Sequence, residues 1–192
     1  MAVRGFRRTF GGRIVLRADE VERGILGDVV TQLVDFVRPQ DDPDADPLAR
    51  LVGIDPDAER PDDPALARLF PDAYSDDDEA ADEFRRFTER SLRETKVAHA
   101  DTVLACLARS GDKVVLSRVE AQAWLGTLND LRLTLGSRLG IQEDNHELLA
   151  SLAEDDPAFS VFHVYDWLTF LQDTLVQALT GLVAEPPPRD AE

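Results

Sequence analysis

Four long stretches of the sequence carry apolar residues at intervals of three and four, the spacing of a helix that packs along one face. They cover residues 19–37, 76–110, 118–139 and 157–180. Ser75, Ser117 and Asp156 precede three of these stretches and are of the residue types that cap helices. The pattern predicts a mostly α-helical fold, a bundle of five or six helices once shorter pieces are counted.

The apolar stripes also predict which side chains form the core. The first stretch has the stripe Val21, Ile25, Val29, Leu33 and Phe36. The third has the stripe Trp124, Leu128, Leu131, Leu135 and Leu139. The last stretch is apolar nearly all round, which is typical of a helix at the centre of a bundle. We therefore expect it to be the most buried element, with Trp167, Phe170 and Leu171 covered.

The first 17 residues predict a basic β-hairpin at one end of the bundle. Gly11 and Gly12 supply the positive φ that tight hairpin turns need, and apolar residues flank them on both sides. These flanking residues are Phe6, Phe10, Ile14 and Leu16. Residues 114–116, Val-Val-Leu, are a short strand candidate that would extend the hairpin to a three-stranded antiparallel sheet.

Residues 38–79 form an acidic, proline-rich connection that holds seven of the 11 prolines. Within it, Asp46-Pro47 and Asp63-Pro64 each place a capping residue before a proline, which predicts two short helices that hold the loop against the core. A further short helix is expected over about 143–153. We expect one helical domain over residues 1–182 and a disordered tail over 183–192.

The charge is strongly negative and unevenly distributed, with 38 acidic and 21 basic residues and a net charge of −17. Residues 1–17 sum to +5 and residues 83–139 to +3, whereas residues 18–82 sum to −15 and residues 140–192 to −10. Such a field argues against wholesale binding to nucleic acid or to an anionic membrane. The N-terminus lacks a signal-like apolar stretch and no apolar run reaches the length of a membrane span, so we expect a soluble cytoplasmic protein.

The sequence contains no complete catalytic or metal-binding motif. The single cysteine, Cys106, excludes an intramolecular disulfide and a cysteine-based metal site, and its apolar flanks predict a buried, unreactive thiol. Glu143 and His146 have the spacing of half a di-iron site, but the second half is absent. His163 and Asp166 are predicted to form a buried hydrogen-bonded pair; the alternative, a general base with its orienting acid, lacks a nucleophile. We therefore expect no cofactor, no metal and no enzymatic activity.

Basic and polar residues at three places are candidates for binding a partner. They are Arg7 and Arg8 of the hairpin, Arg86, Arg90 and Arg93 of the 76–110 helix, and Asn129, Asp130 and Arg132 of the next helix. The bases either face the acidic segments inside the fold or form an exposed surface for a partner. Asn129 and Asp130 are poor helix formers in the middle of a helix, so they either form a buried polar network or face a partner.

Three sequence segments resemble one known family. They are Phe-Arg-Arg-Phe-Thr at 84–88, Trp-Leu-Gly-Thr-Leu-Asn-Asp-Leu-Arg-Leu at 124–133, and Leu-Gly at 139–140. With the order of the predicted elements over most of residues 3–182, they resemble an actinobacterial family catalogued as a domain of unknown function, whose named member is the oxidative-stress regulator AosR. The resemblance implies a role in the transcriptional response to oxidative stress, together with an alternative sigma factor.

The same resemblance implies a setting near Clp proteolysis or thiol metabolism. The chain departs from the family in one respect, because the redox response of the named member is linked to a cysteine pair. This chain has only Cys106, so sensing through a disulfide within one chain is not carried over.

The favoured hypothesis is a non-enzymatic regulator that acts through protein–protein contacts with a sigma factor or another basic protein, steered by the acidic 40–79 loop. The alternatives are an adaptor linked to Clp proteolysis or thiol metabolism, and an enzyme that uses His163 and Asp166. A regulator that binds DNA alone ranks lower because of the negative charge, so we expect DNA to be contacted weakly or indirectly. The sequence leaves open whether the chain forms a homodimer.

Overall fold

The computed structural model describes residues 5–39, 54–55, 58–142, 151–153 and 155–181. In this part of the chain there are five helices and three strands. Their order is β1 (Phe6–Arg8), β2 (Ile14–Arg17), α1 (Glu20–Val37), α3 (Pro64–Leu69), α4 (Asp78–Leu107), β3 (Lys113–Leu116), α5 (Arg118–Arg138) and α7 (Pro157–Thr180). The mostly α-helical fold with a small three-stranded antiparallel sheet is therefore confirmed.

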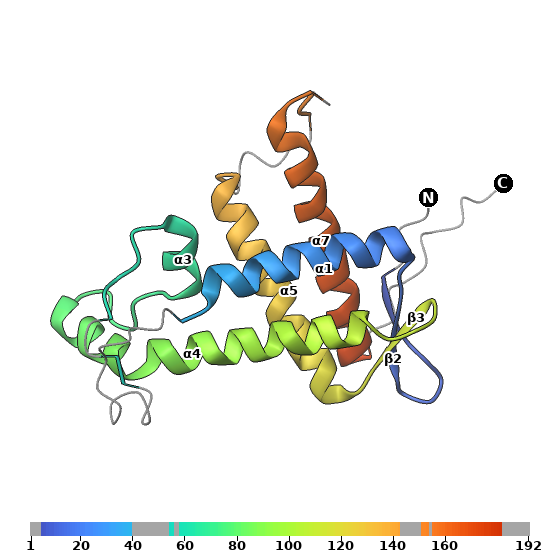
Figure 1. Cartoon of the computed structure of the whole chain (residues 1–192), viewed down its shortest axis with the longest axis horizontal. Helices are drawn as coiled ribbons and strands as arrows, with labels where there is room; N and C mark the ends of the chain where they lie inside the picture. The colour runs from blue at the N-terminus through green and yellow to red at the C-terminus, as the bar shows by residue number, and fades with distance from the viewer. Residues whose placement is uncertain (1–4, 40–53, 56–57, 143–150, 154, 182–192) are drawn as a thin grey trace, which may run out of the picture.

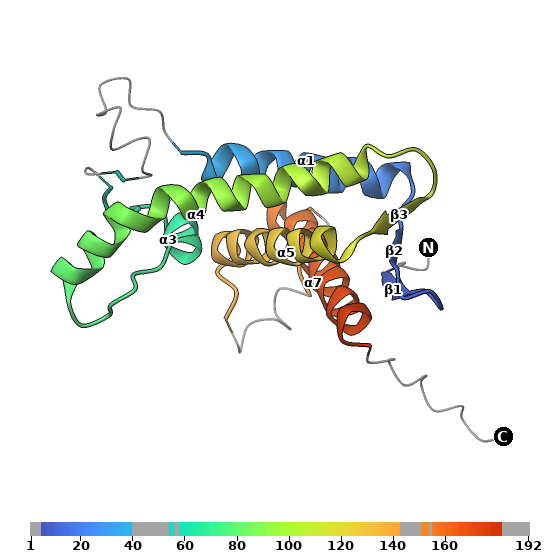
Figure 2. The same cartoon turned by 90° about the horizontal axis from the view of Figure 1, so that it is seen from below.

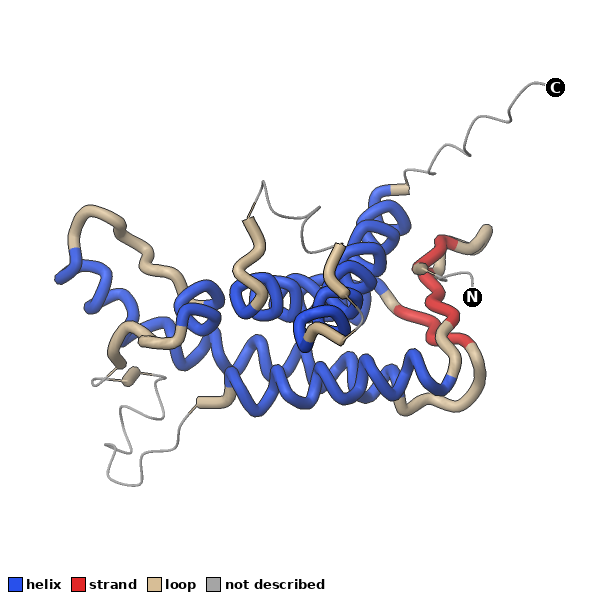
Figure 3. The backbone as a smooth tube through the Cα atoms, turned by 90° about the horizontal axis from the view of Figure 1, so that it is seen from above, coloured by secondary structure: helices blue, strands red, loops and turns tan. Residues whose placement is uncertain are grey.

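The molecule is elongated, with α1 and α4 side by side along its long axis (Figure 1). The view from below shows α5 and α7 packed on one side of this pair (Figure 2). The sheet lies at one end, and Figure 3 shows the three strands gathered there, away from the first turns of α4 at the other end. The two ends of the long axis therefore carry different elements.

Side-chain caps set the starts of the helices. The predicted capping box of Ser117 with Glu120 begins α5, and Asp63 caps α3 with Pro64 in its first turn, as the sequence indicates. Ser75 was predicted to cap the long helix, and this is wrong. Asp77 caps α4, because its carboxylate accepts a hydrogen bond from the Ala80 backbone N–H at 3.0 Å.

The sheet confirms the predicted hairpin and its third strand. β1 pairs with β2 and β2 with β3, all antiparallel, with Leu16 opposite both Phe6 and Val114. Alternation along the strands sends one row of apolar side chains into the core. Gly12 has a φ of 77° in the turn, the conformation that the paired glycines predict. Phe10 lies beside this turn and is fully exposed, so it does not join the core.

The hairpin is attached to the bundle through α7 and α5. The Phe6 backbone N–H donates a hydrogen bond to Thr174 Oγ1 of α7 at 3.0 Å. Gly5 lies so close to Thr174 that an added Cβ would stand 2.5 Å from the Oγ1 atom, so only glycine fits there. The Phe6 ring packs edge-on against Trp124 of α5, with 5.3 Å between ring centroids. The sheet is thereby held in one position on the end of the bundle.

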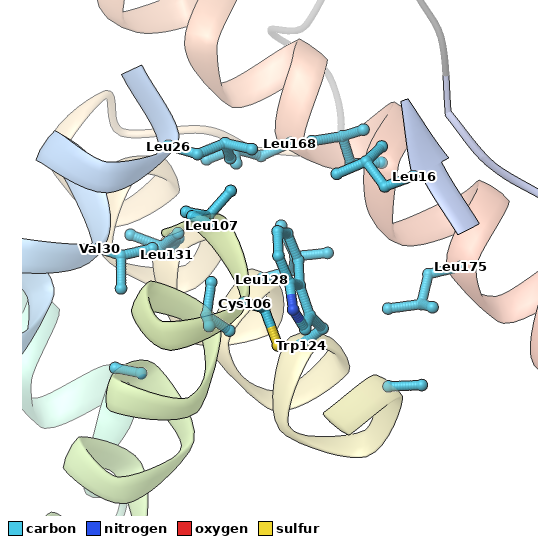
Figure 4. Close-up of a cluster of buried hydrophobic side chains, with 14 of the residues drawn as sticks. Leu16, Leu26, Val30, Cys106, Leu107, Trp124, Leu128, Leu131, Leu168 and Leu175 are labelled. Atoms are coloured by element: carbon cyan, nitrogen blue, oxygen red, sulfur yellow. The ribbon is translucent and has the colours of Figure 1, made fainter. Parts of the chain in front are cut away.

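The core gathers around Trp124, which is fully buried (Figure 4). Leucines of α5, α7 and β2 surround it, and Cys106 of α4 lies beside it. The burial of Trp124, Leu128 and Leu131 confirms this part of the predicted α5 stripe. Side chains of this size each contribute roughly 1.5–3 kcal/mol through burial, so this cluster is the main source of stability.

The predicted face of α1 is partly wrong. Leu33 is buried and Val29 and Phe36 pack partly buried against the core, but Val21 is 70% exposed and Ile25 37% exposed. The buried stripe is Leu26, Val30, Leu33, Val34 and Val37, and the packing of α1 on α4 and α5 selects it.

The prediction that the last helix is the most buried is wrong. α5 packs against α1, α3, α4 and α7, whereas α7 packs mainly against α5 and the sheet. Leu171 is buried as expected, but Phe170 is 38% exposed.

Some predicted features lie outside the described residues. These are the short helix beginning at Asp46-Pro47, the Glu143–His146 pair, most of the 143–153 helix, and the 183–192 tail.

Candidate functional site

Arginines in the middle of α4 are engaged inside the fold. Arg85 is 5% exposed, and its guanidinium bonds Asp72 at 2.6 Å, Glu89, and the Phe70 carbonyl at 3.2 Å. Burial acts to lower the pKa of Arg85, but the bonds to Glu89 and Asp72 outweigh it and the pKa is raised. Glu89 also binds Arg93 at 2.7 Å, and this network joins the 70–72 segment to α4.

Arg93 connects the same network to α1. Its guanidinium donates to the Val37 carbonyl at 3.1 Å and lies 4.3 Å from the centroid of the Phe70 ring. Arg90, one turn away, pairs with Glu94 at 3.3 Å. Of the three α4 arginines that the sequence offered for a partner, only Arg86 has an exposed side chain.

The polar residues of α5 split between the interior and the surface. Asp130 is 5% exposed and binds Lys96 Nζ at 2.7 Å, which joins α5 to α4. Burial raises the pKa of Asp130, although Lys96 opposes the shift. Arg132 donates to Thr169 at 2.9 Å and to Gln172 on α7 at 2.7 Å. Asn129 faces outward and is exposed. Of the two interpretations that the sequence left open, the buried network describes Asp130, while Asn129 lies on the surface.

The outer face of the sheet carries bases with no partner among the described residues. Arg7, Arg17 and Lys113 are all exposed, and no described side chain forms an ion pair or hydrogen bond with any of them. With Val15 they line a shallow hollow of about 480 Å³. Arg8 is also exposed, but it lies opposite Ile14 and therefore on the other side of the sheet, near the end of α7. We call Arg7, Arg17, Lys113 and Val15 the basic face.

The opposite end of the molecule carries acidic residues that are likewise exposed and outside any described ion pair. The loop before α4 and the first turns of α4 expose Asp76, Asp77, Asp78, Glu79, Asp82 and Glu83. None of these carboxylates forms an ion pair with a described residue. Among them lie three exposed aromatic side chains, Tyr74 (51%), Phe84 (47%) and Phe87 (54%). Tyr74 and Phe84 pack edge to face, 6.1 Å between centroids. We call these acids and aromatic residues the acidic end.

The candidate enzymatic pair is not buried. His163 and Asp166 are both exposed on α7, so the predicted buried pair is wrong. Residues 163 and 166 lie off the stripe of buried residues 168, 171 and 175, and the His163 ring packs on the Phe159 ring with 4.2 Å between centroids. The predicted burial of Cys106 is confirmed, since the side chain is 0% exposed. Burial also raises the pKa of the Cys106 thiol, which disfavours the reactive thiolate.

The described residues offer no grouping of three or more histidine, cysteine, aspartate or glutamate side chains that could hold a metal ion. Within the same ranges, no helix combines the length and the apolar character that crossing a membrane requires.

The structure therefore does not bring together the residues predicted to bind a partner. Arg7 belongs to the basic face, Arg8 lies on the other side of the same strand, and Arg86 and Asn129 lie exposed on α4 and α5. The remaining four are engaged within the fold. Sequence reasoning missed Arg17 and Lys113. Strand alternation could have found them, because residues 15 and 17, and likewise 113 and 115, share one face of a sheet.

Comparison with known proteins gives the family. Residues 3–179 match the family model described as "Domain of unknown function (DUF2017)". The "Oxidative stress regulator AosR" of Mycobacterium tuberculosis (strain ATCC 25618 / H37Rv) is 37% identical over 151 residues, which is 71% of this chain and 68% of the relative. The "Putative oxidative stress regulator AosR" of Mycobacterium leprae (strain TN) is 36% identical over 148 residues, 70% of this chain and 67% of the relative. No solved structure shows significant similarity to the chain. On the match over residues 3–179 and the identity to these relatives, the chain belongs to the DUF2017 family.

Proposed function

We propose that this chain is a non-enzymatic regulator in the response to oxidative stress, which acts by binding a basic protein such as a sigma factor. The names of the mycobacterial relatives, at 36–37% identity, support the regulatory part of the proposal. The exposed positions of His163 and Asp166 on α7, outside any described pocket, support the absence of an active site there.

The observation that carries the contact with a basic protein is the acidic end. Tyr74, Phe84 and Phe87 are each about half exposed, and aromatic residues are enriched in the central, energetically dominant parts of protein interfaces. Six carboxylates without an ion-pair partner in the described structure surround them. Opposite charges steer the encounter of two proteins, and the buried aromatic side chains then supply the affinity. A basic partner with apolar pockets fits this surface.

The other predicted contacts take secondary places in this proposal. Arg86 is exposed between Phe84 and Phe87 and would lie at the edge of the interface. Asn129 is exposed on α5, outside the acidic end. Arg90, Arg93, Asp130 and Arg132 would act indirectly, by holding α4 and α5 in place. DNA alone is disfavoured because a chain with a net charge of −17 repels phosphates, and a strong binder makes about 6–10 phosphate contacts.

The test is a titration of the purified chain against each alternative sigma factor of its source organism at about 0.15 M salt. Replacing both Tyr74 and Phe84 with alanine should weaken binding by at least about tenfold, since hot-spot truncation costs about 2 kcal/mol or more. Val119→Ala is the matched control, because Val119 is 74% exposed and lies at the start of α5. It should leave the affinity unchanged.

Two outcomes would contradict the proposal. Submicromolar binding of random duplex DNA without any partner would show a direct DNA-binding regulator instead, provided that it is lost when Arg86, Arg90 and Arg93 are replaced by alanine in a variant that keeps its fold. A sigma factor that binds the double variant as tightly as the original chain would remove the acidic end from the proposal.

A further inference from the structure

The basic face brings like charges together in a way that the fold does not need. Arg17 of β2 lies directly opposite Lys113 of β3, and Arg7 of β1 lies opposite Val15. Because Val15 and Arg17 are two residues apart, Arg7, Arg17 and Lys113 share the outer side of the sheet. Like charges directly opposite each other destabilise a sheet pair, and no described residue neutralises these two. The arrangement therefore indicates a negatively charged occupant from outside the molecule.

The shape of the face narrows the chemistry of the occupant. The hollow of about 480 Å³ has Val15 in its floor, and Val115, 38% exposed, lies beside Val15 on the neighbouring strand. A row of phosphates has no apolar group to place on these valines. A protein surface that mixes carboxylates with apolar side chains satisfies both the three bases and the two valines.

The chain itself presents such a surface. The acidic end combines six carboxylates that lack ion-pair partners in the described structure with the rings of Tyr74, Phe84 and Phe87. Figure 1 shows the first turns of α4 and the sheet at opposite ends of the long axis, so the two surfaces cannot meet within one molecule. They can meet only between molecules.

We propose that the basic face is a docking site for the acidic end of a second copy of this chain, so that copies associate head to tail. The bases of one copy would face the carboxylates of the next, and the aromatic rings would cover Val15 and Val115. Such a contact joins two different surfaces, so it leaves a free basic face and a free acidic end on every pair. Association would therefore continue beyond the dimer, into short chains or a closed ring.

This inference goes beyond the proposed function but shares one surface with it. A basic partner that binds the acidic end would compete with the second copy and release the chain as a monomer. The test below uses the purified chain alone, so its result does not depend on whether a sigma factor binds.

The first experiment is sedimentation velocity of the full chain from micromolar concentration up to about 1 mM. The expected result is a sedimentation coefficient that rises with concentration at about 0.1 M salt and falls back at about 1 M, where the Debye length shrinks from about 10 Å to about 3 Å. Arg17→Glu should abolish the rise. Arg38→Glu is the matched control, an exposed arginine outside both surfaces, and should keep it.

The Arg17→Glu variant also separates docking from folding. It replaces a like-charge pair with an ion pair across the strands to Lys113, so its melting temperature should not fall. Loss of association with an unchanged or raised melting temperature supports a docking role. Loss of both would mean that the sheet had been damaged, and Arg7→Glu, which faces Val15 across the strands, would then replace Arg17→Glu in both experiments.

The second experiment mixes two defective variants. Arg17→Glu retains its acidic end, and the double variant Phe84→Ala with Phe87→Ala retains its basic face without adding a charge that could attract the introduced glutamate. Each should be monomeric alone, and an equimolar mixture should form a dimer that grows no further. Three results would overturn the proposal. The original chain could stay monomeric at about 1 mM in 0.1 M salt, or the mixture of the two variants could stay monomeric. The third result is binding of duplex DNA that Arg17→Glu abolishes.

Discussion

Two groups of arginines in this chain have opposite surroundings. Arg85 and Arg93, on the inward side of α4, bind carboxylates and carbonyls from three segments and are largely buried. Arg7 and Arg17, at the sheet, are exposed and have no partner among the described residues. A cluster of arginines in a sequence therefore does not identify a binding surface. An arginine is available to a partner only where the fold brings no carboxylate within reach of its guanidinium.

The energetics of the two groups differ for the same reason. Removing one member of a buried ion pair leaves the other charge without compensation and is strongly destabilising, whereas a surface charge contributes little to stability. The central arginines are therefore constrained by folding. Arg7 and Arg17 of the sheet contribute little to folding, so binding to a partner can determine which residues occupy these positions.

The largest expected effect comes from breaking the central network. Arg85→Met removes the shared partner of Asp72 and Glu89, but Arg60 still pairs with Asp72 and Arg93 with Glu89. The free energy of unfolding should therefore fall by about 3 kcal/mol, the lower end of the range for a broken buried pair. Arg7→Met, the matched change on the basic face, should stay within about 0.5 kcal/mol. Urea unfolding of both variants measures this, and equal losses would show that the two regions do not differ.

The Lys96–Asp130 pair tests whether the contrast extends to lysines. Lys96→Met should cost about 3 kcal/mol near neutral pH, because it leaves the buried Asp130 carboxylate unpaired. Burial already raises the pKa of Asp130, and loss of Lys96 would raise it further. A raised carboxyl pKa means that the folded state binds the proton more readily, so the loss should grow as pH rises through that pKa and shrink below it.

Urea unfolding across a pH series measures this dependence. Lys113→Met on the basic face is the control and should show a small change at every pH. A loss in the Lys96 variant that does not vary with pH would contradict the role given to Asp130.

An intermediate effect is expected at Glu120, which lies between the two regions. Arg109 and the Ser117 backbone lower the pKa of Glu120 from 4.5 to about 2, so its stabilisation is present above pH 4.5 and is lost as pH falls toward 2. Arg109 is 44% exposed, so solvent screening reduces the contribution to about 1–2 kcal/mol. Glu120→Gln should flatten the acid side of the stability curve, whereas Glu79→Gln should not. Overlapping stability curves for the original chain and Glu120→Gln would show that the Arg109–Glu120 pair does not stabilise the fold.

The smallest effect has the opposite sign. Arg17→Glu should raise the free energy of unfolding by about 0.2–1 kcal/mol, because an ion pair with Lys113 replaces a like-charge pair. Thermal unfolding at a concentration where the chain is monomeric measures it, with Arg38→Glu as the neutral reference. A clear loss of stability would mean that Arg17 contributes to the fold after all, and the contrast between the two regions would disappear.

Local signals predicted much of the fold. The glycine pair, the capping box at Ser117 and the Asp63-Pro64 start each act within a few residues, and the structure has all three. The buried face of α1 could not be predicted in this way. Two stripes of equal spacing were available there, and only the position of α4 and α5 selects Leu26 and Val30.

The candidate surfaces were predicted less well, because pairing of charges is a property of the tertiary structure. Arg86 and Arg93 are alike in the sequence, yet Glu89 and the Val37 carbonyl engage only Arg93. Cys106 was predicted correctly, since its apolar flanks and its place on a helical stripe already point into the core. The exposed aromatic residues at 74, 84 and 87 carry no periodic signal that separates them from core residues.

The attachment of the hairpin to α7 has a consequence for how the chain is made. The hydrogen bond from the Phe6 backbone to Thr174 spans 168 residues, and β3 also joins β2 from far along the chain. Protein synthesis delivers the N-terminus first, and contacts between distant segments form slowly. The hairpin can therefore take its place on the bundle only after residue 174 has been synthesised. A growing chain that has not reached this residue, or one truncated before it, lacks the contact that holds the hairpin arginines at this end of the bundle.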